Sequence, residues 1–150
     1  MTVFCDASVL VAGCLEGHPE YTRAKAVLDR VSQRADTGHT AAHALAETFS
    51  VLSRMPTIPK LRPVDVLAIL ETNVFPHFTI SVLAAEDYPK NIRALVAKSL
   101  GGGRIYDMLH VGVARNLPVD RIYTFNDAEW KVLAPDLTNL ICQPPALPSS

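Results

Sequence analysis

Near its start the chain reads Val3-Phe4-Cys5-Asp6-Ala7-Ser8, and this stretch decides the fold class. Three consecutive apolar residues are typical of a strand that is buried on both faces, as strands of parallel sheets are. The run ends at the carboxylate of Asp6, and an apolar helix is predicted over residues 9–15, with Ser8 as its N-cap. Asp6 then lies at the carboxyl end of a strand, where open α/β sheets bind their ligands.

The rest of the chain repeats this alternation of strand and helix patterns. Strands are predicted over residues 78–82, 121–124 and 137–142, with a break that could hold a very short strand at 38–40. Helices are predicted over residues 19–35, 41–54, 64–74, 86–100 and 105–116. Alternation of this kind predicts a three-layer α/β/α sandwich, in which helices cover both faces of a central parallel sheet. Residues 1–142 are expected to form one domain, and the Pro/Ser-rich residues 143–150 a solvated tail.

Composition narrows the class of protein. Of the 150 residues 49% are hydrophobic and 19% charged, which is typical of one globular domain. The formal net charge of -1 excludes a global positive field, so binding of nucleic acid would require a local basic patch. Three cysteines without CxxC spacing argue against a disulfide framework or a cysteine-based zinc site and favour a reducing cytoplasm. No run approaches the roughly 18 apolar residues of a membrane span, so no membrane association is expected.

Polar side chains follow two of the predicted strands. Asp6 comes directly after the first strand, and Asn126 and Asp127 follow the strand at 121–124. Local alternatives remain open, because Asp6 could form a turn or cap a helix, and either Asn126 or Asp127 could cap the next one. The carboxyl ends of parallel strands share one edge of a sheet, so these side chains are expected to meet.

Two further acids lie on predicted helices. Glu47 is the one acid between Asp36 and Asp65, and Asp107 lies in the first turn of its helix. Glu47 could be a solvated surface residue, and Asp107 could be stabilised there by the helix dipole. Several carboxylates that share one cleft repel each other unless a cation lies among them. Oxygen ligands suit Mg²⁺ or Mn²⁺, and such a metal with an activated water is suited to phosphodiester hydrolysis.

Four short motifs, taken in order, resemble one known family. They are Val3-Phe4-Cys5-Asp6-Ala7-Ser8, Ala46-Glu47-Thr48-Phe49-Ser50-Val51-Leu52, Ile105-Tyr106-Asp107-Met108-Leu109-His110 and Tyr123-Thr124-Phe125-Asn126. Each is weak alone, but their order and spacing from residue 3 to about 142 resemble the PIN domain, and within it the VapC toxins of bacterial toxin–antitoxin pairs. The resemblance implies an α/β/α fold, a Mg²⁺- or Mn²⁺-dependent endoribonuclease that acts on cellular RNA, a VapB-type antitoxin as partner, and a homodimer.

The resemblance also implies roles for individual residues. Asp6, Glu47 and Asp107 match the first three acids of the family, with Asp6 and Asp107 as direct metal ligands. Ser8 and Thr124 match hydroxyl positions that order the site. The chain departs from the family at the fourth acid, where Asn126 stands in place of the Asp that many relatives carry, so that one tightly bound ion is expected. Asp127, which is next to Asn126, and His110, one helical turn after Asp107, are further candidates for the site.

Substrate contacts and other functions stay open. Arg104 and Arg115, near the helix of Asp107, are candidate RNA phosphate contacts, although such arginines are often only solvated. A catalytically inactive PIN module that acts by binding RNA or protein is one alternative. The other is a Mg²⁺-dependent phosphotransfer domain with Asp6 as phospho-acceptor, but a receiver domain would need a second acid beside the first, and the sequence lacks it.

Overall fold

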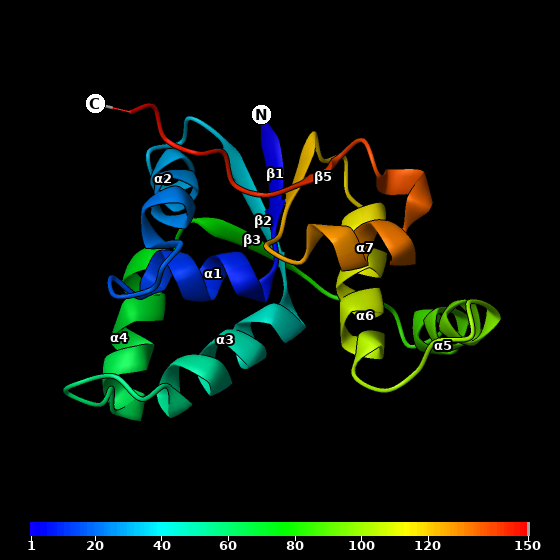
Figure 1. Ribbon diagram of the computed structural model, residues 1–150, viewed down its shortest axis with the longest axis horizontal. Helices are drawn as coiled ribbons and strands as arrows, with labels where there is room; N and C mark the ends of the chain where they lie inside the picture. Colours follow the sequence, from blue (N-terminus) through cyan, green and yellow to red (C-terminus); the bar gives the residue numbers. More distant parts are fainter. Residues whose placement is uncertain (150) are drawn as a thin grey trace.

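The computed structural model describes residues 1–149, and within them a parallel sheet forms the centre of the molecule (Figure 1). Its five strands lie in the order β3-β2-β1-β4-β5, and every neighbouring pair is parallel. The strands are β1 Thr2–Cys5, β2 Thr37–Ala41, β3 Phe78–Ser81, β4 Arg121–Tyr123 and β5 Ile141–Cys142. The predicted parallel sheet is confirmed, and the short strand at 38–40 is a full member of it beside β1.

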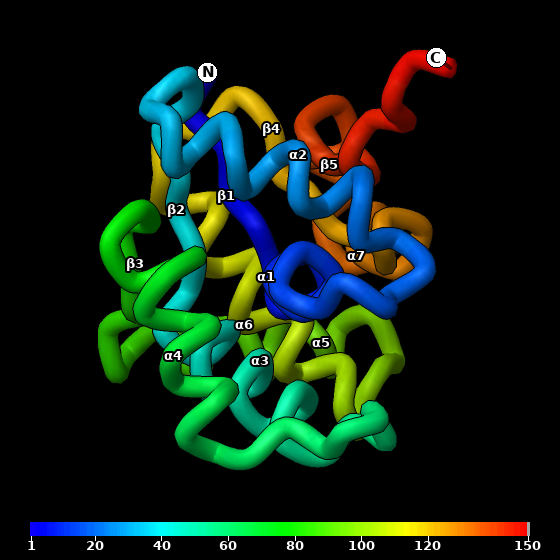
Figure 2. The backbone as a smooth tube through the Cα atoms, turned by 90° about the vertical axis from the view of Figure 1, so that its left-hand side faces the viewer, coloured from blue at the N-terminus to red at the C-terminus, as the bar shows by residue number. Residues whose placement is uncertain are grey.

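Helices cover both faces of this sheet and complete the three layers. Those on one side are α1 Ala7–Cys14, α2 Tyr21–Ser32, α3 Ala42–Arg54 and α4 Pro63–Asn73. Those on the other side are α5 Asp87–Ala97, α6 Arg104–Arg115 and α7 Asp127–Leu133. In Figure 2 α1 and α2 lie in front of the strands, and in Figure 1 α3 runs beneath their lower ends. The predicted α/β/α architecture is therefore confirmed.

The link between β1 and α1 differs from the sequence expectation. Asp6, not Ser8, is the N-cap of α1, because its carboxylate accepts a hydrogen bond from the backbone N–H of Val9. The helix consequently begins at Ala7, two residues earlier than predicted. Since the chain turns from strand to helix within one residue, the side chain of Asp6 is held at the carboxyl end of β1.

Hydrophobic periodicity predicted α2 well and α3 poorly. The stripe of Ala24, Val27, Leu28 and Val31 is buried, as expected from its spacing. On α3 the spacing of Leu45, Phe49 and Leu52 predicts one apolar face, yet the buried residues are Ala44, Thr48 and Leu52, and Phe49 is 39% exposed. Small residues on α3 allow the helix to approach its neighbours closely, so the larger side chains lie at the edge of the contact.

The C-terminal part holds more helix and less strand than the sequence indicated. The strand predicted over residues 137–142 is limited to β5, because residues 135–137 form a 3₁₀ turn. Helix α7 was considered only as a possible start after Asn126, yet it buries Trp130 completely. After β5 the chain is still held: Arg23 Nε donates to the carbonyl oxygen of Pro144 at 2.9 Å.

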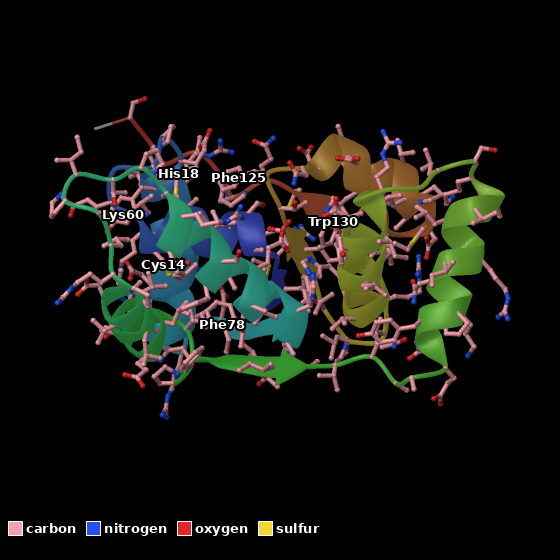
Figure 3. The ribbon with its side chains drawn as sticks, turned by 90° about the horizontal axis from the view of Figure 1, so that it is seen from below. Cys14, His18, Lys60, Phe78, Phe125 and Trp130 are labelled. Atoms are coloured by element: carbon pink, nitrogen blue, oxygen red, sulfur yellow. The ribbon has the colours of Figure 1, made fainter. Side chains whose placement is uncertain are left out.

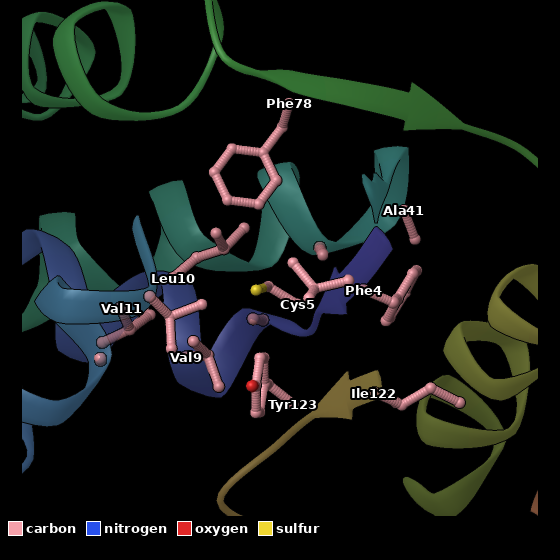
Figure 4. Packing of buried hydrophobic residues seen from close by; sticks show 14 of the residues in the cluster. Phe4, Cys5, Val9, Leu10, Val11, Ala41, Phe78, Ile122 and Tyr123 are labelled. Atoms are coloured by element: carbon pink, nitrogen blue, oxygen red, sulfur yellow. The ribbon is translucent and has the colours of Figure 1, made fainter. Parts of the chain in front are cut away.

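The core surrounds β1, whose apolar residues Val3, Phe4 and Cys5 are fully buried (Figure 4). Phe4 packs toward Trp130 on one side of the sheet, with ring centroids 6.4 Å apart, while Leu10 packs on the α1 side. Within the described residues, no helix has the length and apolar character needed to cross a membrane. The rigid centre of the sheet therefore carries the loop on which Asp6 lies.

Candidate active site

A cleft of about 280 Å³ opens where β1 and β4 end. Figure 3 views the molecule from this end, with α3 and α6 on either side of the middle and Phe125 and Trp130 close to it. The residues that line the cleft are Asp6, Ala7, Ser8, Val11, His18, Glu20, Glu47, Val51, Asp107, His110, Phe125 and Asn126. The structure thus brings together Asp6, Glu47, Asp107 and Asn126, which lie up to 120 positions apart in the chain by their numbering.

Asp6 is the most firmly held of these side chains. One carboxylate oxygen accepts from the Ser8 hydroxyl at 2.6 Å and from the Val9 N–H at 3.1 Å. The other accepts from the Thr124 hydroxyl at 2.6 Å, across 118 residues of sequence. The Ser8 hydroxyl also accepts from the Phe125 N–H at 3.0 Å, which joins the β1 and β4 loops. Ser8 and Thr124 therefore fix the orientation of the Asp6 carboxylate.

All of the donors to Asp6 are neutral, and this has an electrostatic consequence. Burial raises the pKa of Asp6 to about 6, and the charge of Asp107 raises it further, against the lowering effect of the Ser8, Thr124 and Val9 hydrogen bonds. A carboxylate without a positive partner in a buried position is costly to ionise. The buried Asp6 carboxylate therefore lacks a positively charged partner.

Asp107 approaches the cleft from the first turn of α6. Its carboxylate accepts a hydrogen bond from the indole N–H of Trp130 at 3.3 Å. Burial raises the pKa of Asp107, and the charges of Glu129 and Glu47 add to this effect, while the Trp130 hydrogen bond lowers it. Trp130 is fully buried, so α7 supplies a rigid support for this acid.

Glu47 lies on α3 opposite His110 of α6. Its side chain is 43% exposed, and its Oε2 atom lies 3.7 Å from His110 Nε2. Burial, helped by the charge of His43, lowers the pKa of His110 to about 4, so that the imidazole is neutral at neutral pH. The Glu47–His110 contact is therefore not an ion pair under those conditions.

The side chains of Asn126 and Asp127, near the position of the fourth family acid, point in different directions. Asn126 lines the cleft, whereas the Asp127 carboxylate accepts from Gln143 at 2.8 Å and lies 3.6 Å from Lys131 Nζ. The hydrogen bond from Gln143 and the charge of Lys131 lower the pKa of Asp127. Thr124 supports this corner too, because its hydroxyl accepts from the Asn126 N–H at 3.0 Å. Asn126 is thus the side chain that faces the three acids.

Sequence reasoning missed two residues of the cleft, His18 and Glu20. Both lie in the connection between α1 and α2, where His18 Nδ1 accepts from the Glu20 N–H at 3.1 Å. Glu20 also pairs with Arg23 at 2.9 Å. No periodicity marks these positions, since they belong to a loop that only the packing of α2 onto α1 brings to the cleft.

The two arginines singled out as RNA contacts are both engaged with surface carboxylates. Arg104 Nε lies 2.9 Å from Glu129, and Arg115 makes two hydrogen bonds to Asp136 at 3.0 and 3.1 Å. Arg104 lies one helical turn before Asp107, while Arg115 lies at the other end of α6. These ion pairs are exposed and can exchange for phosphate at little cost.

The donor set of the cleft fits a divalent cation. Four carboxylates line it, those of Asp6, Glu20, Glu47 and Asp107, and the lining residues within the described part of the chain include no lysine or arginine. Burial, and to a smaller extent the charges of neighbouring acids, raise the pKa values of Asp6 and Asp107, so a counter-charge in the cleft would favour their ionised forms. Oxygen-rich sites of this kind bind hard dications.

Comparisons with known proteins agree with this fold. A family model for the PIN domain matches residues 3–134, and the chain belongs to the PIN-domain family. Within that family its relatives are VapC ribonucleases. It is 35% identical over 104 residues to ribonuclease VapC40 of Mycobacterium tuberculosis, covering 69% of this chain and 72% of that protein. It is 37% identical over 67 residues to VapC27 of the same organism, covering 45% of this chain and about half, 47%, of that relative.

A solved structure supports the fold independently. The crystal structure of Mycobacterium tuberculosis VapC20, described as a toxin that cleaves the sarcin-ricin loop, superposes with a TM-score of 0.64. The match covers 83% of this chain and 89% of that one at 19% sequence identity. At this identity the likeness concerns the fold, which is the three-layer arrangement described above.

Proposed function

We propose that this chain is a metal-dependent endoribonuclease, the toxin of a VapBC-type pair, which cleaves cellular RNA and so inhibits translation. The observation that carries the proposal is the buried Asp6 carboxylate, which shares with Glu47, Asp107 and Asn126 a cleft whose lining, over residues 1–149, includes no lysine or arginine. Membership of the PIN family and similarity to VapC ribonucleases support the same activity.

The cation would be held by Asp6 and Asp107, with Glu47 of the same cleft as a direct or water-mediated ligand. When bound there, it supplies a Lewis acid for the scissile phosphate and lowers the pKa of a water. Oxygen donors favour Mg²⁺ or Mn²⁺. Because Asn126 contributes no charge, the site is expected to bind a single ion tightly.

The chain's own residues have distinct tasks around that ion. Ser8 and Thr124 hold both Asp6 oxygens by donated hydrogen bonds, so the carboxylate cannot rotate away. Trp130 does the same for one oxygen of Asp107. Positioning partners of this kind commonly change metal affinity or activity by roughly 10–100-fold. Glu47 reaches the cleft from α3, where it could act as a general base that accepts a proton from an attacking water.

Single substitutions test the catalytic assignment. Asp6→Asn and Asp107→Asn should each abolish cleavage of total cellular RNA in the presence of Mg²⁺ or Mn²⁺, because each removes one ligand charge. Glu71→Gln, an exposed acid of α4, is the matched control and should retain full activity. Circular dichroism checks that each variant is folded. Full activity of the Asp6 and Asp107 variants, or of the native protein in excess EDTA, would overturn the metal mechanism.

An antitoxin is the expected protein partner, and an apolar groove beside the cleft suits it. The groove is lined by Leu15, Met55, Leu61 and the fully exposed Ile58, and His18 belongs to both groove and cleft. It lies between the loops that precede α2 and α4. We infer that a VapB-type antitoxin places an apolar segment here and extends a basic residue toward the acids.

Growth assays test the toxin role and the groove together. Expression of the chain alone should arrest growth, and co-expression of the antitoxin should restore it. Ile58→Asp should keep the RNA cleavage and the arrest but weaken the rescue, since a charge in an apolar groove is costly to desolvate. Val132→Asp, at an exposed position of α7, is the control. Harmless expression of the folded native chain would contradict the toxin role.

We also propose that the protein acts in the cytoplasm, where RNA is present. We further propose that it forms a homodimer, which light scattering of the purified chain would test.

A further inference from the structure

Three potential metal ligands gather beside the cleft but are not all part of it. His43 and Glu47 lie four residues apart on α3, and His110 faces them from α6. One ligand atom from each of the three lies within 4.8 Å of the others, and this is the one such group found within residues 1–149. His110 lines both the catalytic cleft and a separate small cavity, of about 50 Å³, which His43 also lines.

The unsatisfied nitrogen of His110 is an independent sign of a missing partner. His110 is 2% exposed, and its Nε2 atom makes no hydrogen bond. The closest acid, Glu47, is 3.7 Å away, which is too long for a hydrogen bond. Buried polar atoms are nearly always paired, so an orphan nitrogen that faces a carboxylate requires an explanation. A cation between Nε2 and the carboxylate would satisfy both.

Aromatic packing holds the two imidazoles in place without using their nitrogens. The His43 ring stacks on Tyr106 at a centroid distance of 5.2 Å and an interplanar angle of 5°. It is also 5.4 Å from the ring of His110, which in turn lies 6.3 Å from Trp130. Ligands that are already oriented lose less conformational entropy when they bind an ion.

The chemistry of this group differs from that of the carboxylate site. Two imidazole nitrogens and one carboxylate oxygen form a borderline donor set, which prefers first-row transition metals to Mg²⁺. Two histidines and one glutamate are a ligand set used for zinc, with a fourth position left for water. We propose that His43, Glu47 and His110 form a second cation site that takes a transition dication such as Zn²⁺, adjacent to the Asp6–Asp107 site and sharing the Glu47 side chain with it.

Binding of Zn²⁺ to the purified, untagged full-length chain in excess Mg²⁺ tests this site. Titration calorimetry should show one site, and Co²⁺ in its place should give the visible absorption of a nitrogen-ligated ion. His43→Ala removes an exposed ligand without disturbing the core and should weaken Zn²⁺ binding by roughly 100-fold or more, since loss of an outer-shell partner alone costs 10–100-fold. Glu47→Gln should weaken it as well.

Control variants separate this site from others that could bind zinc. His77→Ala and Cys142→Ser, each away from the cluster, should leave the Zn²⁺ affinity unchanged. Asp6→Asn should remove Mg²⁺ binding but keep Zn²⁺ binding, so the outcome does not depend on nuclease activity. The proposal is overturned if the native chain binds no Zn²⁺, if His43→Ala binds it as tightly as the native chain, or if affinity is lost in Asp6→Asn or Cys142→Ser instead.

Discussion

Asp6 combines a structural and a chemical role in one side chain. Its carboxylate caps α1 through the Val9 N–H and also accepts from Ser8 and Thr124. The helix-cap alternative raised by the sequence is therefore correct, and it does not exclude metal binding. The three accepted hydrogen bonds use three of the about four lone pairs that a carboxylate offers, so one lone pair on Oδ2 remains for a cation. The hydrogen bonds fix where this lone pair points.

The raised pKa of Asp6 predicts a pH-dependent gain of stability in Asp6→Asn. The folded pKa is about 6 against 3.8 for the free side chain, so the folded state binds more protons between these values. Native stability should therefore fall as pH rises through that range. In EDTA, Asp6→Asn should be more stable than the native chain by about 1–3 kcal/mol above pH ~7, and the gain should shrink toward pH ~4.

Urea unfolding at several pH values measures this difference. The lowered pKa of His110 acts in the opposite direction, since native stability should fall as pH drops below about 6.5, but this contribution is common to both proteins and cancels. Adding Mg²⁺ or Mn²⁺ should reverse the order, because the cation stabilises only the protein that retains the carboxylate. A pH-independent difference between the two proteins would show that burial of Asp6 does not raise its pKa.

At the scale of elements, β2 shows what a strand requires beyond hydrophobicity. The sequence around Gly38-His39-Thr40 looks like a break, yet β2 lies between β1 and β3. A Cβ on Gly38 would lie 2.5 Å from Val31 of α2 and 2.9 Å from Phe78 of β3. The glycine is needed because α2 packs directly on the strand. This requirement comes from a contact between elements and has no signature in the strand itself.

Gly38→Ala should accordingly destabilise the fold. Overpacking of this kind costs about 1–3 kcal/mol, because Val31 or the Phe78 ring must move. Thermal unfolding of the variant should show a lower midpoint than the native chain. Gly17→Ala is the control, since a Cβ there meets nothing within 4 Å. Equal stability of Gly38→Ala and the native chain would mean that α2 can shift without cost.

At the scale of the whole molecule, a net charge of -1 leaves RNA binding to local groups. Arg104 and Arg115 are the first and last residues of the same helix, eleven positions apart, which is about 16 Å along the axis. Arg104 lies beside the turn that carries Asp107, so phosphate bound in the cleft is closer to Arg104. Its present partner, Glu129, is solvent-exposed and easily displaced.

Charge removal at these two arginines should therefore have unequal effects. We expect Arg104→Gln to weaken RNA binding and to reduce the slope of log affinity against log salt by about one phosphate contact. Arg115→Gln should have the smaller effect. Filter binding to the catalytically inactive Asp107→Asn protein, at several salt concentrations, measures both. Equal affinities for Arg104→Gln and its parent would remove Arg104 from the RNA interface.

The sequence by itself determined the fold class and three of the acids of the cleft. Buried strands and amphipathic helices produce local hydrophobic patterns, and Asp6 directly follows such a strand. The fold class and the position of Asp6 could therefore be predicted from neighbouring residues. Glu47 and Asp107 rested on the order of family motifs. The polar residues at the end of β4 also pointed to Thr124 and Asn126. They did not indicate which of the neighbouring side chains faces the cleft.

The tertiary structure alone decided which side chains meet. Thr124 donates to Asp6 across 118 residues, Trp130 supports Asp107 from α7, and His110 faces Glu47 with an unsatisfied nitrogen. These contacts join elements on opposite sides of the sheet, where sequence separation carries no information about distance. Local patterns report what each residue does within its own helix or strand, whereas the site is formed by the packing of those elements around β1.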